Sequence, residues 1–112
     1  FWASWCGPCQ APMAKMQTYR AQHPEWGDKV ELIALSIDKT KAAASNHLKS
    51  RGWDKTHNVW AGDGAFGAAA PKKYGIRGIP TLFVIDQQGK VAKKGHPSSI
   101  NVPEVITELL KK

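Results

Sequence analysis

The sequence predicts an α/β fold in which a β-sheet has helices on both of its faces. Segments with helical spacing alternate along the chain with short apolar runs rich in β-branched residues, and this alternation is typical of such folds. The last two of these runs are separated only by a turn, so they predict an antiparallel pair. A length of 112 residues and a hydrophobic content of 42% suit one compact domain, which we expect to span residues 1–112.

We expect the elements in the order strand, helix, strand, helix, strand, helix, strand, strand, helix. They cover residues 1–3, 7–22, 30–38, 41–51, 57–61, 65–74, 81–86, 91–95 and 102–110. The third and seventh elements are almost entirely apolar, so we expect both of them to be buried strands. Pro12 is expected to kink the first long helix, because a proline beyond the first turn removes a hydrogen bond. Asn101 and Glu104 have the spacing of a helix cap.

The composition argues against several classes of protein. Basic residues outnumber acidic ones by 16 to 9, but they are scattered or form short pairs. We therefore interpret the basic residues as a solvated face and expect no nucleic-acid partner. The apolar runs are far shorter than the roughly 20 residues that a membrane helix needs. The chain opens without an initiator Met or a leader pattern, so we expect it to be part of a longer protein.

Both cysteines of the chain lie in its opening stretch. Residues 1–9 are Phe-Trp-Ala-Ser-Trp-Cys-Gly-Pro-Cys, so that Cys6 and Cys9 fall at the predicted start of a helix. At such a position, free N–H groups and the positive end of the helix dipole stabilise a thiolate, the form that attacks disulfides. Gly7 allows a tight turn, and Pro8 fits a first helical turn. This arrangement favours redox chemistry.

A zinc site or an inert buried pair is the alternative use of two such cysteines. A zinc site usually needs two further Cys or His ligands at close spacing. The four histidines of the chain are far apart: His23, His47, His57 and His96. We therefore predict a redox pair with no metal and no organic cofactor.

Two motifs resemble the thioredoxin superfamily: the stretch at residues 1–9, and Gly-Ile-Pro-Thr at residues 78–81, just before a predicted strand. The resemblance implies a thioredoxin-like fold with a central mixed sheet. It also implies that Pro80 is in the cis form next to the cysteine pair, and that the backbone of Ile79 pairs with the substrate. The substrate-binding residues that it implies are Trp5, Gly7, Pro8, Ile79 and Pro80.

The two motifs are farther apart than in compact thioredoxins, and this spacing resembles the TlpA/ResA-like thiol–disulfide oxidoreductases. A strand and a helix at roughly residues 40–64 lie where that branch carries an insertion before the cis-proline strand. The branch implies the bacterial periplasm or another extracytoplasmic space, with a possible membrane tether outside this segment. It also implies that a central strand and a buried acid lie upstream of Phe1. No carboxylate downstream is an obvious substitute for that acid.

The resemblance implies thiol–disulfide exchange, with Cys6 as the nucleophile and Cys9 as the resolving thiol. A Gly-Pro pair between the cysteines resembles the reducing thioredoxins. We therefore expect reduction of a disulfide-containing protein substrate, with a thiol protein as the electron donor. Two alternatives stay open. One is a thiol peroxidase of the peroxiredoxin type, although Ala3 stands where those enzymes normally carry Thr; the other is a non-catalytic binding module with the same fold.

Overall fold

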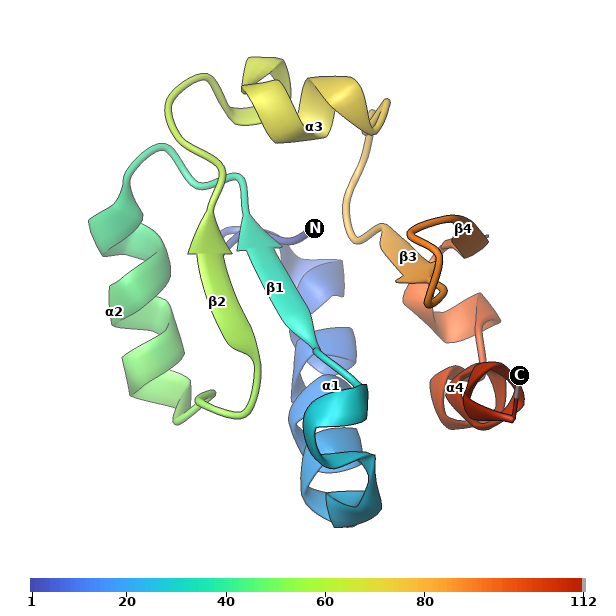
Figure 1. Ribbon diagram of the computed structural model, residues 1–112. Coiled ribbons are helices and arrows are strands. Elements are labelled where there is room, and N and C mark those ends of the chain that lie inside the picture. Colours follow the sequence, from blue (N-terminus) through green and yellow to red (C-terminus); the bar gives the residue numbers. More distant parts are fainter. Residues whose placement is uncertain (112) are drawn as a thin grey trace.

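The computed structural model describes residues 1–111, which fold into helices and short strands (Figure 1). The α-helices are α1 (Gln10–Gln22), α2 (Lys41–Arg51), α3 (Ala69–Lys73) and α4 (Val102–Leu110). The strands are β1 (Ile33–Ser36), β2 (His57–Trp60), β3 (Leu82–Ile85) and β4 (Val91–Gly95). Short 3₁₀ turns lie at Gly7–Cys9, Pro24–Lys29, Ala65–Gly67 and Pro97–Ser99. None of the helices in this part of the chain is long and apolar enough to cross a membrane.

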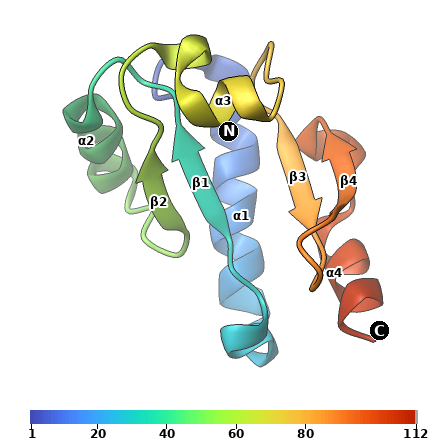
Figure 2. The same cartoon turned by 45° about the horizontal axis from the view of Figure 1, so that its top comes forward.

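The strands form two sheets of two strands each. β1 pairs with β2 in parallel, and β3 pairs with β4 antiparallel. The register places Ile33 opposite His57 and Leu82 opposite Gly95. Figures 1 and 2 show α2 beside β2, while β3, β4 and α4 make up the other side of the molecule. The thioredoxin-like mixture of parallel and antiparallel strands is therefore present, but the expected central sheet is divided between β1 and β3.

The first two residues lie between the two sheets and bond to both. The backbone N–H of Trp2 donates to the carbonyl of Leu35 at 3.0 Å, and the carbonyl of Trp2 accepts from Ile37 at 2.9 Å. On the other side, the amino group of Phe1 donates to the carbonyl of Thr81 at 2.9 Å. Phe1 and Trp2 thus link the β1 edge to the start of β3. The longer strand predicted upstream of Phe1 lies outside the described residues and stays a prediction.

An apolar hollow of about 550 Å³ lies between the facing edges of β1 and β3, and α1 contributes Met13 and Met16 to its lining. The prediction that these two strands are buried on both faces is wrong at Ile33 and Ile85, which are 60% and 46% exposed. Both side chains line the hollow, where no described strand covers them. Each strand is also shorter than predicted, with four residues.

Two groups of buried side chains form the core. The larger group surrounds the cysteines and consists of Trp2, Ala3, Cys6, Cys9, Met13, Ala34, Ile37, Ala44 and Trp53. The smaller group joins Trp26 to Val102 and Ile106 of α4, with Met16 and Tyr19 of α1 packed against it. Helix α1 therefore contributes to both groups and connects the two sides of the molecule.

Helices α2 and α4 lie where the sequence predicted them, and each has a capping residue at its start. At the start of α2, the Thr40 hydroxyl accepts a hydrogen bond from the N–H of Ala43 at 3.1 Å. Gly52 ends α2 with a φ of 68°, a conformation that favours glycine. At the start of α4, the Asn101 side chain accepts from the N–H of Glu104 at 3.2 Å, so the predicted cap is confirmed.

The first helix begins later than predicted. Gly7–Cys9 is a 3₁₀ turn, and regular α1 starts only at Gln10. Pro12 therefore lies in the first turn of α1, where its missing N–H has no intrahelical partner to lose. Helix α1 continues without a break to Gln22, and the expected kink at Pro12 is wrong.

The helix predicted at residues 65–74 is also different. Ala68 is extended, with a ψ of 161°, and separates the 3₁₀ turn Ala65–Gly67 from α3. Pro71 is the third residue of α3 and so, like Pro12, lies in a first turn. The predicted segment is therefore two short helical pieces.

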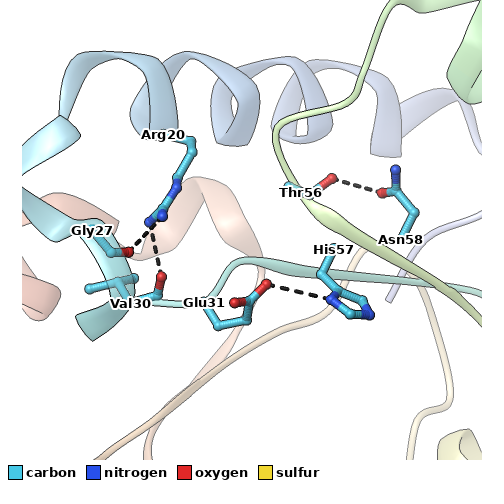
Figure 3. Close-up of polar contacts among 7 residues, drawn as sticks. All are labelled: Arg20, Gly27, Val30, Glu31, Thr56, His57 and Asn58. Carbon is cyan, nitrogen blue, oxygen red and sulfur yellow. Dashed lines mark hydrogen bonds and ion pairs between the residues drawn. The ribbon is translucent and has the colours of Figure 1, made fainter.

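Side-chain hydrogen bonds connect the end of α1 to the segment that leads into β1 (Figure 3). Arg20 donates from Nη1 to the carbonyl of Val30 at 2.9 Å and from Nη2 to the carbonyl of Gly27 at 2.7 Å. Glu31 and His57 lie 3.7 Å apart where β1 and β2 begin. The two bonds of Arg20 therefore tie the segment before β1 to α1. The opposite end of β1 reaches the cysteine loop.

Candidate active site

Cys6 and Cys9 are joined by a disulfide at the start of the first helical segment. Cys6 is the residue before the 3₁₀ turn, and its carbonyl accepts a hydrogen bond from the N–H of Cys9 at 3.3 Å. Cys6 is 5% exposed, whereas Cys9 is completely buried. A partner that approaches from solvent therefore meets the sulfur of Cys6 first.

The surface around Cys6 is open. Trp5 is 61% exposed, and Gly7 and Pro8 are also exposed. A Cβ atom added at Gly7 would meet no other atom within 4 Å, and Gly7 does not have a positive φ. Neither the backbone conformation nor a close contact therefore requires a glycine at this position. Because Gly7 has no side chain, the space beside Cys6 is free.

The second motif lies against the disulfide. The peptide bond between Ile79 and Pro80 is cis, and the carbonyl oxygen of Ile79 is 3.8 Å from the Sγ of Cys6. A disulfide sulfur carries no hydrogen, so this is a contact in the oxidised state; a thiol at the same position can donate to the carbonyl. Ile79 also packs against the core group that contains both cysteines. The fold thus brings together the two motifs that the sequence singled out.

Asp38 is a site residue that the sequence did not reveal. Its side chain is 1% exposed, and each carboxylate oxygen lies 3.1 Å from the backbone N–H of Ser4. The hydroxyls of Ser4 and Ser36 also donate to it, at 2.5 Å each. Because Ser4 lies two residues before Cys6, these bonds hold the turn that carries the more accessible sulfur. Asp38 thus places a downstream carboxylate beside the cysteine turn, although the sequence offered no obvious substitute for the acid expected upstream of Phe1.

Gln10 supports the same turn from the other side. Its side-chain amide donates to the carbonyl of Cys6 at 2.8 Å, and its side-chain oxygen lies 2.7 Å from Nε2 of His47 on α2. The turn is therefore connected to α2 as well as to the end of β1.

The sequence held only weak signals for Asp38 and Gln10. Asp38 ends an apolar run, where a carboxylate is also common as an ordinary strand boundary. Gln10 directly follows Cys9, but its partner His47 comes from a different helix. Neither contact follows from local spacing, because each depends on the tertiary fold.

No cluster suited to a metal ion accompanies the cysteines in the part of the chain that the structure describes. Three or more His, Cys, Asp or Glu side chains do not come together anywhere in residues 1–111. The sulfurs of Cys6 and Cys9 are instead bonded to each other.

Comparison with protein families and curated proteins agrees with this geometry. A family profile described as "Thioredoxin-like" matches residues 1–91, which include both motifs. Thiol-disulfide oxidoreductase ResA of Bacillus thuringiensis is 36% identical over 114 residues, covering 100% of this chain and 60% of that protein. Nucleoredoxin of Bos taurus is 32% identical over 103 residues, covering 90% of this chain and 23% of that protein. The chain thus spans about 60% of the length of its ResA relative.

Solved structures extend the similarity to the whole arrangement of elements. A Chlorobium tepidum protein assigned as thiol:disulfide interchange protein DsbE superimposes with a TM-score of 0.78 at 28% identity, covering 97% of this chain and 76% of that one. StoA from Bacillus subtilis gives a TM-score of 0.69 at 25% identity, covering 86% and 69%. These matches and the shared motifs show that the chain belongs to the thioredoxin-like family, among the relatives of ResA.

Proposed function

We propose that residues 1–112 form a single thioredoxin-like domain that acts as a thiol–disulfide oxidoreductase and reduces disulfides in other proteins. The observation that carries this proposal is the Cys6–Cys9 disulfide, whose more accessible sulfur faces the Ile79 carbonyl directly before a cis proline. The relative named as a thiol-disulfide oxidoreductase supports the same activity.

The first step is the attack of Cys6 on the substrate disulfide. The start of the helical segment favours the Cys6 thiolate, because unpaired N–H groups and the helix dipole place positive charge there. The thiolate displaces one substrate sulfur and forms a new S–S bond between Cys6 and the other. The displaced sulfur leaves as a thiolate and takes up a proton from solvent.

The second step is the attack of Cys9 on the mixed disulfide. The Cys9 thiolate bonds to the sulfur of Cys6, and the second substrate sulfur leaves as a thiolate. Two electrons have then passed from the dithiol to the substrate, and the Cys6–Cys9 disulfide has formed. Because Cys9 is completely buried, external disulfides have little access to it before Cys6 has reacted. A thiol protein would return the disulfide to the dithiol by the reverse exchange.

The proposed substrate surface consists of the residues around Cys6. Trp5, Gly7 and Pro8 are exposed on one side, and Ile79 and Pro80 are half-buried on the other. The substrate chain would lie between them with its backbone next to Ile79. We further propose that the domain works in an extracytoplasmic space of a bacterium, where protein disulfides form and persist, with any membrane tether outside this segment.

Single cysteine variants test the proposal. Cys9→Ser is expected to accumulate a mixed disulfide with a substrate protein such as oxidised insulin, because the resolving thiol is gone. Cys6→Ser is expected to form none, since the buried Cys9 thiol cannot reach a substrate disulfide to attack it in place of Cys6. Non-reducing electrophoresis followed by mass spectrometry measures both. Equal trapping by the two variants would overturn the assignment of roles.

Two further measurements separate this function from its rivals. Rapid turnover of hydrogen peroxide by the dithiol, without reduction of any disulfide, would replace the proposal with a thiol peroxidase. Partner binding that is unchanged when both cysteines are serine, together with no disulfide reduction by the wild type, would indicate a non-catalytic binding module.

A further inference from the structure

A second hollow lies beside the cis-proline loop. It has a volume of about 390 Å³ and is lined by residues 75–81 and Lys94. One of its lining residues, Ile79, has its carbonyl oxygen 3.8 Å from the Sγ of Cys6. A polypeptide whose disulfide reaches Cys6 therefore passes next to this hollow.

The region around the hollow is strongly basic. Arg77 and Lys94 line the hollow itself and are exposed. Residues 64–100 contain six basic side chains: Lys72, Lys73, Arg77, Lys90, Lys93 and Lys94. The same range contains a single acid, Asp86, whose Oδ1 accepts hydrogen bonds from the N–H groups of Gln88 and Lys90.

Within the described residues 1–111, these cations have no carboxylate partners. Among residues 1–111, the ion pairs within 4.0 Å are His23 with Glu25 and His57 with Glu31, so no Lys or Arg takes part. The ammonium group of Lys94 lies 5.5 Å from the centre of the Phe83 ring, a contact that leaves its charge unneutralised. Residues 1–24, which include the cysteine loop, contain no Asp or Glu. Neither segment therefore supplies an exposed acid that would neutralise Arg77 and Lys94, and the carboxylate beside the cysteine turn, Asp38, is buried and accepts hydrogen bonds from Ser4 and Ser36.

We propose that this surface selects protein substrates that carry acidic side chains next to the reactive disulfide. The inference rests on the exchange function proposed above and names the class of substrate that it serves. A carboxylate in the hollow would be attracted by both Arg77 and Lys94, and the planar guanidinium of Arg77 can bind it through two hydrogen bonds.

The lining of the hollow favours an extended peptide over a flat anionic membrane. Its lining includes the apolar side chains of Ile76, Ile79 and Pro80 as well as the two cations. At Gly78 a side chain is absent, and an added Cβ would meet nothing within 4 Å, so a peptide backbone has room to approach. Opposite charges of this kind raise the rate of encounter and select against partners of like charge.

A pair of matched peptides tests the proposal with the full protein. Each peptide carries one disulfide of the same ring size, flanked by glutamates in one peptide and by lysines in the other. At low ionic strength the reduced wild-type protein should reduce the glutamate peptide about tenfold faster, because electrostatic attraction acts mainly on association. This ratio should approach one in about 0.5 M salt, where charges are screened within a few ångströms. Quenched-flow alkylation of the thiols measures both rates.

Charge-reversal variants locate the effect. R77E/K94E is expected to invert the preference, so that the lysine peptide reacts faster than the glutamate peptide. K41E/K49E makes the same change in net charge on α2, which lies away from β3 and β4 (Figure 1), and should keep the wild-type preference. R77Q/K94Q, which only neutralises the charges, should bring the two rates together. Circular dichroism confirms that each variant is folded.

The outcomes separate this inference from the proposed function. If 2-hydroxyethyl disulfide, which is small and neutral, is not reduced at all, the exchange function fails. If it is reduced but the wild type treats both peptides equally, only the acidic-substrate inference is overturned. Equal peptide rates combined with R77- and K94-dependent binding to phosphatidylglycerol vesicles would replace the substrate surface with a membrane-binding one.

Discussion

The two sides of the molecule are packed to different degrees. On the side of β1, β2 and α2, nine buried residues form one group, in which Ala3, Cys9 and Ile37 are completely buried. On the side of β3, β4 and α4, only three buried residues form a group, and most of β4 is exposed. The difference follows from the connections, because the helix between parallel strands covers their sheet while a hairpin can leave one face in water.

The two motifs of the candidate site lie on different sides of the molecule. The disulfide belongs to the well-packed side, where Asp38 and Gln10 hold the turn around Cys6. The cis-proline loop leads into β3 on the sparsely packed side. The contact between Cys6 and Ile79 therefore crosses the boundary between the two. The sulfurs therefore lie in the more densely packed part of the molecule, whereas the cis-proline loop beside them leads into the less densely packed part.

The largest expected effect is on the free energy of unfolding, when one buried isoleucine from each side is replaced by alanine. Ile37→Ala should reduce the free energy of unfolding by about 4 kcal/mol, because this side chain is completely buried in the larger group. Ile106→Ala should cost only about 2 kcal/mol, since its neighbours border an open hollow and can relax into the space. Urea unfolding measures both values. Equal losses would mean that the two sides are packed equally well.

The next effect concerns the buried carboxylate. Asp38→Asn should reduce the free energy of unfolding by about 2 kcal/mol, because an amide cannot accept all the hydrogen bonds that the carboxylate receives from Ser4 and Ser36. Disulfide reduction should also slow at temperatures where the variant is folded. Asp54→Asn is the control, since Asp54 is exposed. A variant with wild-type stability and rate would show that Asp38 does not hold the cysteine turn.

The smallest expected effect comes from a variant on the less packed side, in the cap of α4. Asn101→Ala should reduce the free energy of unfolding by about 1 kcal/mol, because it removes the cap that accepts from the N–H of Glu104. Hydrogen exchange should rise first in α4, while α2 keeps its protection. Thr40→Ala removes the corresponding cap of α2 and serves as the matched variant. Simultaneous loss of protection in both helices would indicate that the molecule opens as one unit.

Elements with their own local signals were predictable from the sequence. α2 has Thr40 before it and Gly52 after it, and α4 has Asn101 before it; these residues act through neighbours a few positions away. The hairpin of β3 and β4 also follows from its short turn. The cysteine loop and the cis-proline loop were predictable because each is a compact motif.

Features that depend on distant parts of the chain were not predictable. The exposure of Ile33 follows from the absence of a described strand on the side of β1 opposite β2, which an apolar run cannot reveal. The contact between Asp38 and Ser4 joins positions 34 residues apart. Pro12 was misinterpreted because regular α1 starts three residues later than the spacing of the cysteines suggested.

The hollow between β1 and β3 has a consequence for handling residues 1–112 by themselves in solution. Beyond the contacts of Phe1 and Trp2, no described residue pairs with the facing edges of these strands. Unpaired strand edges with exposed apolar side chains accept strands from other molecules and promote aggregation. The net charge of +7 opposes such contacts by mutual repulsion. Because salt screens that repulsion, these residues should stay monomeric longest in dilute, low-salt solution.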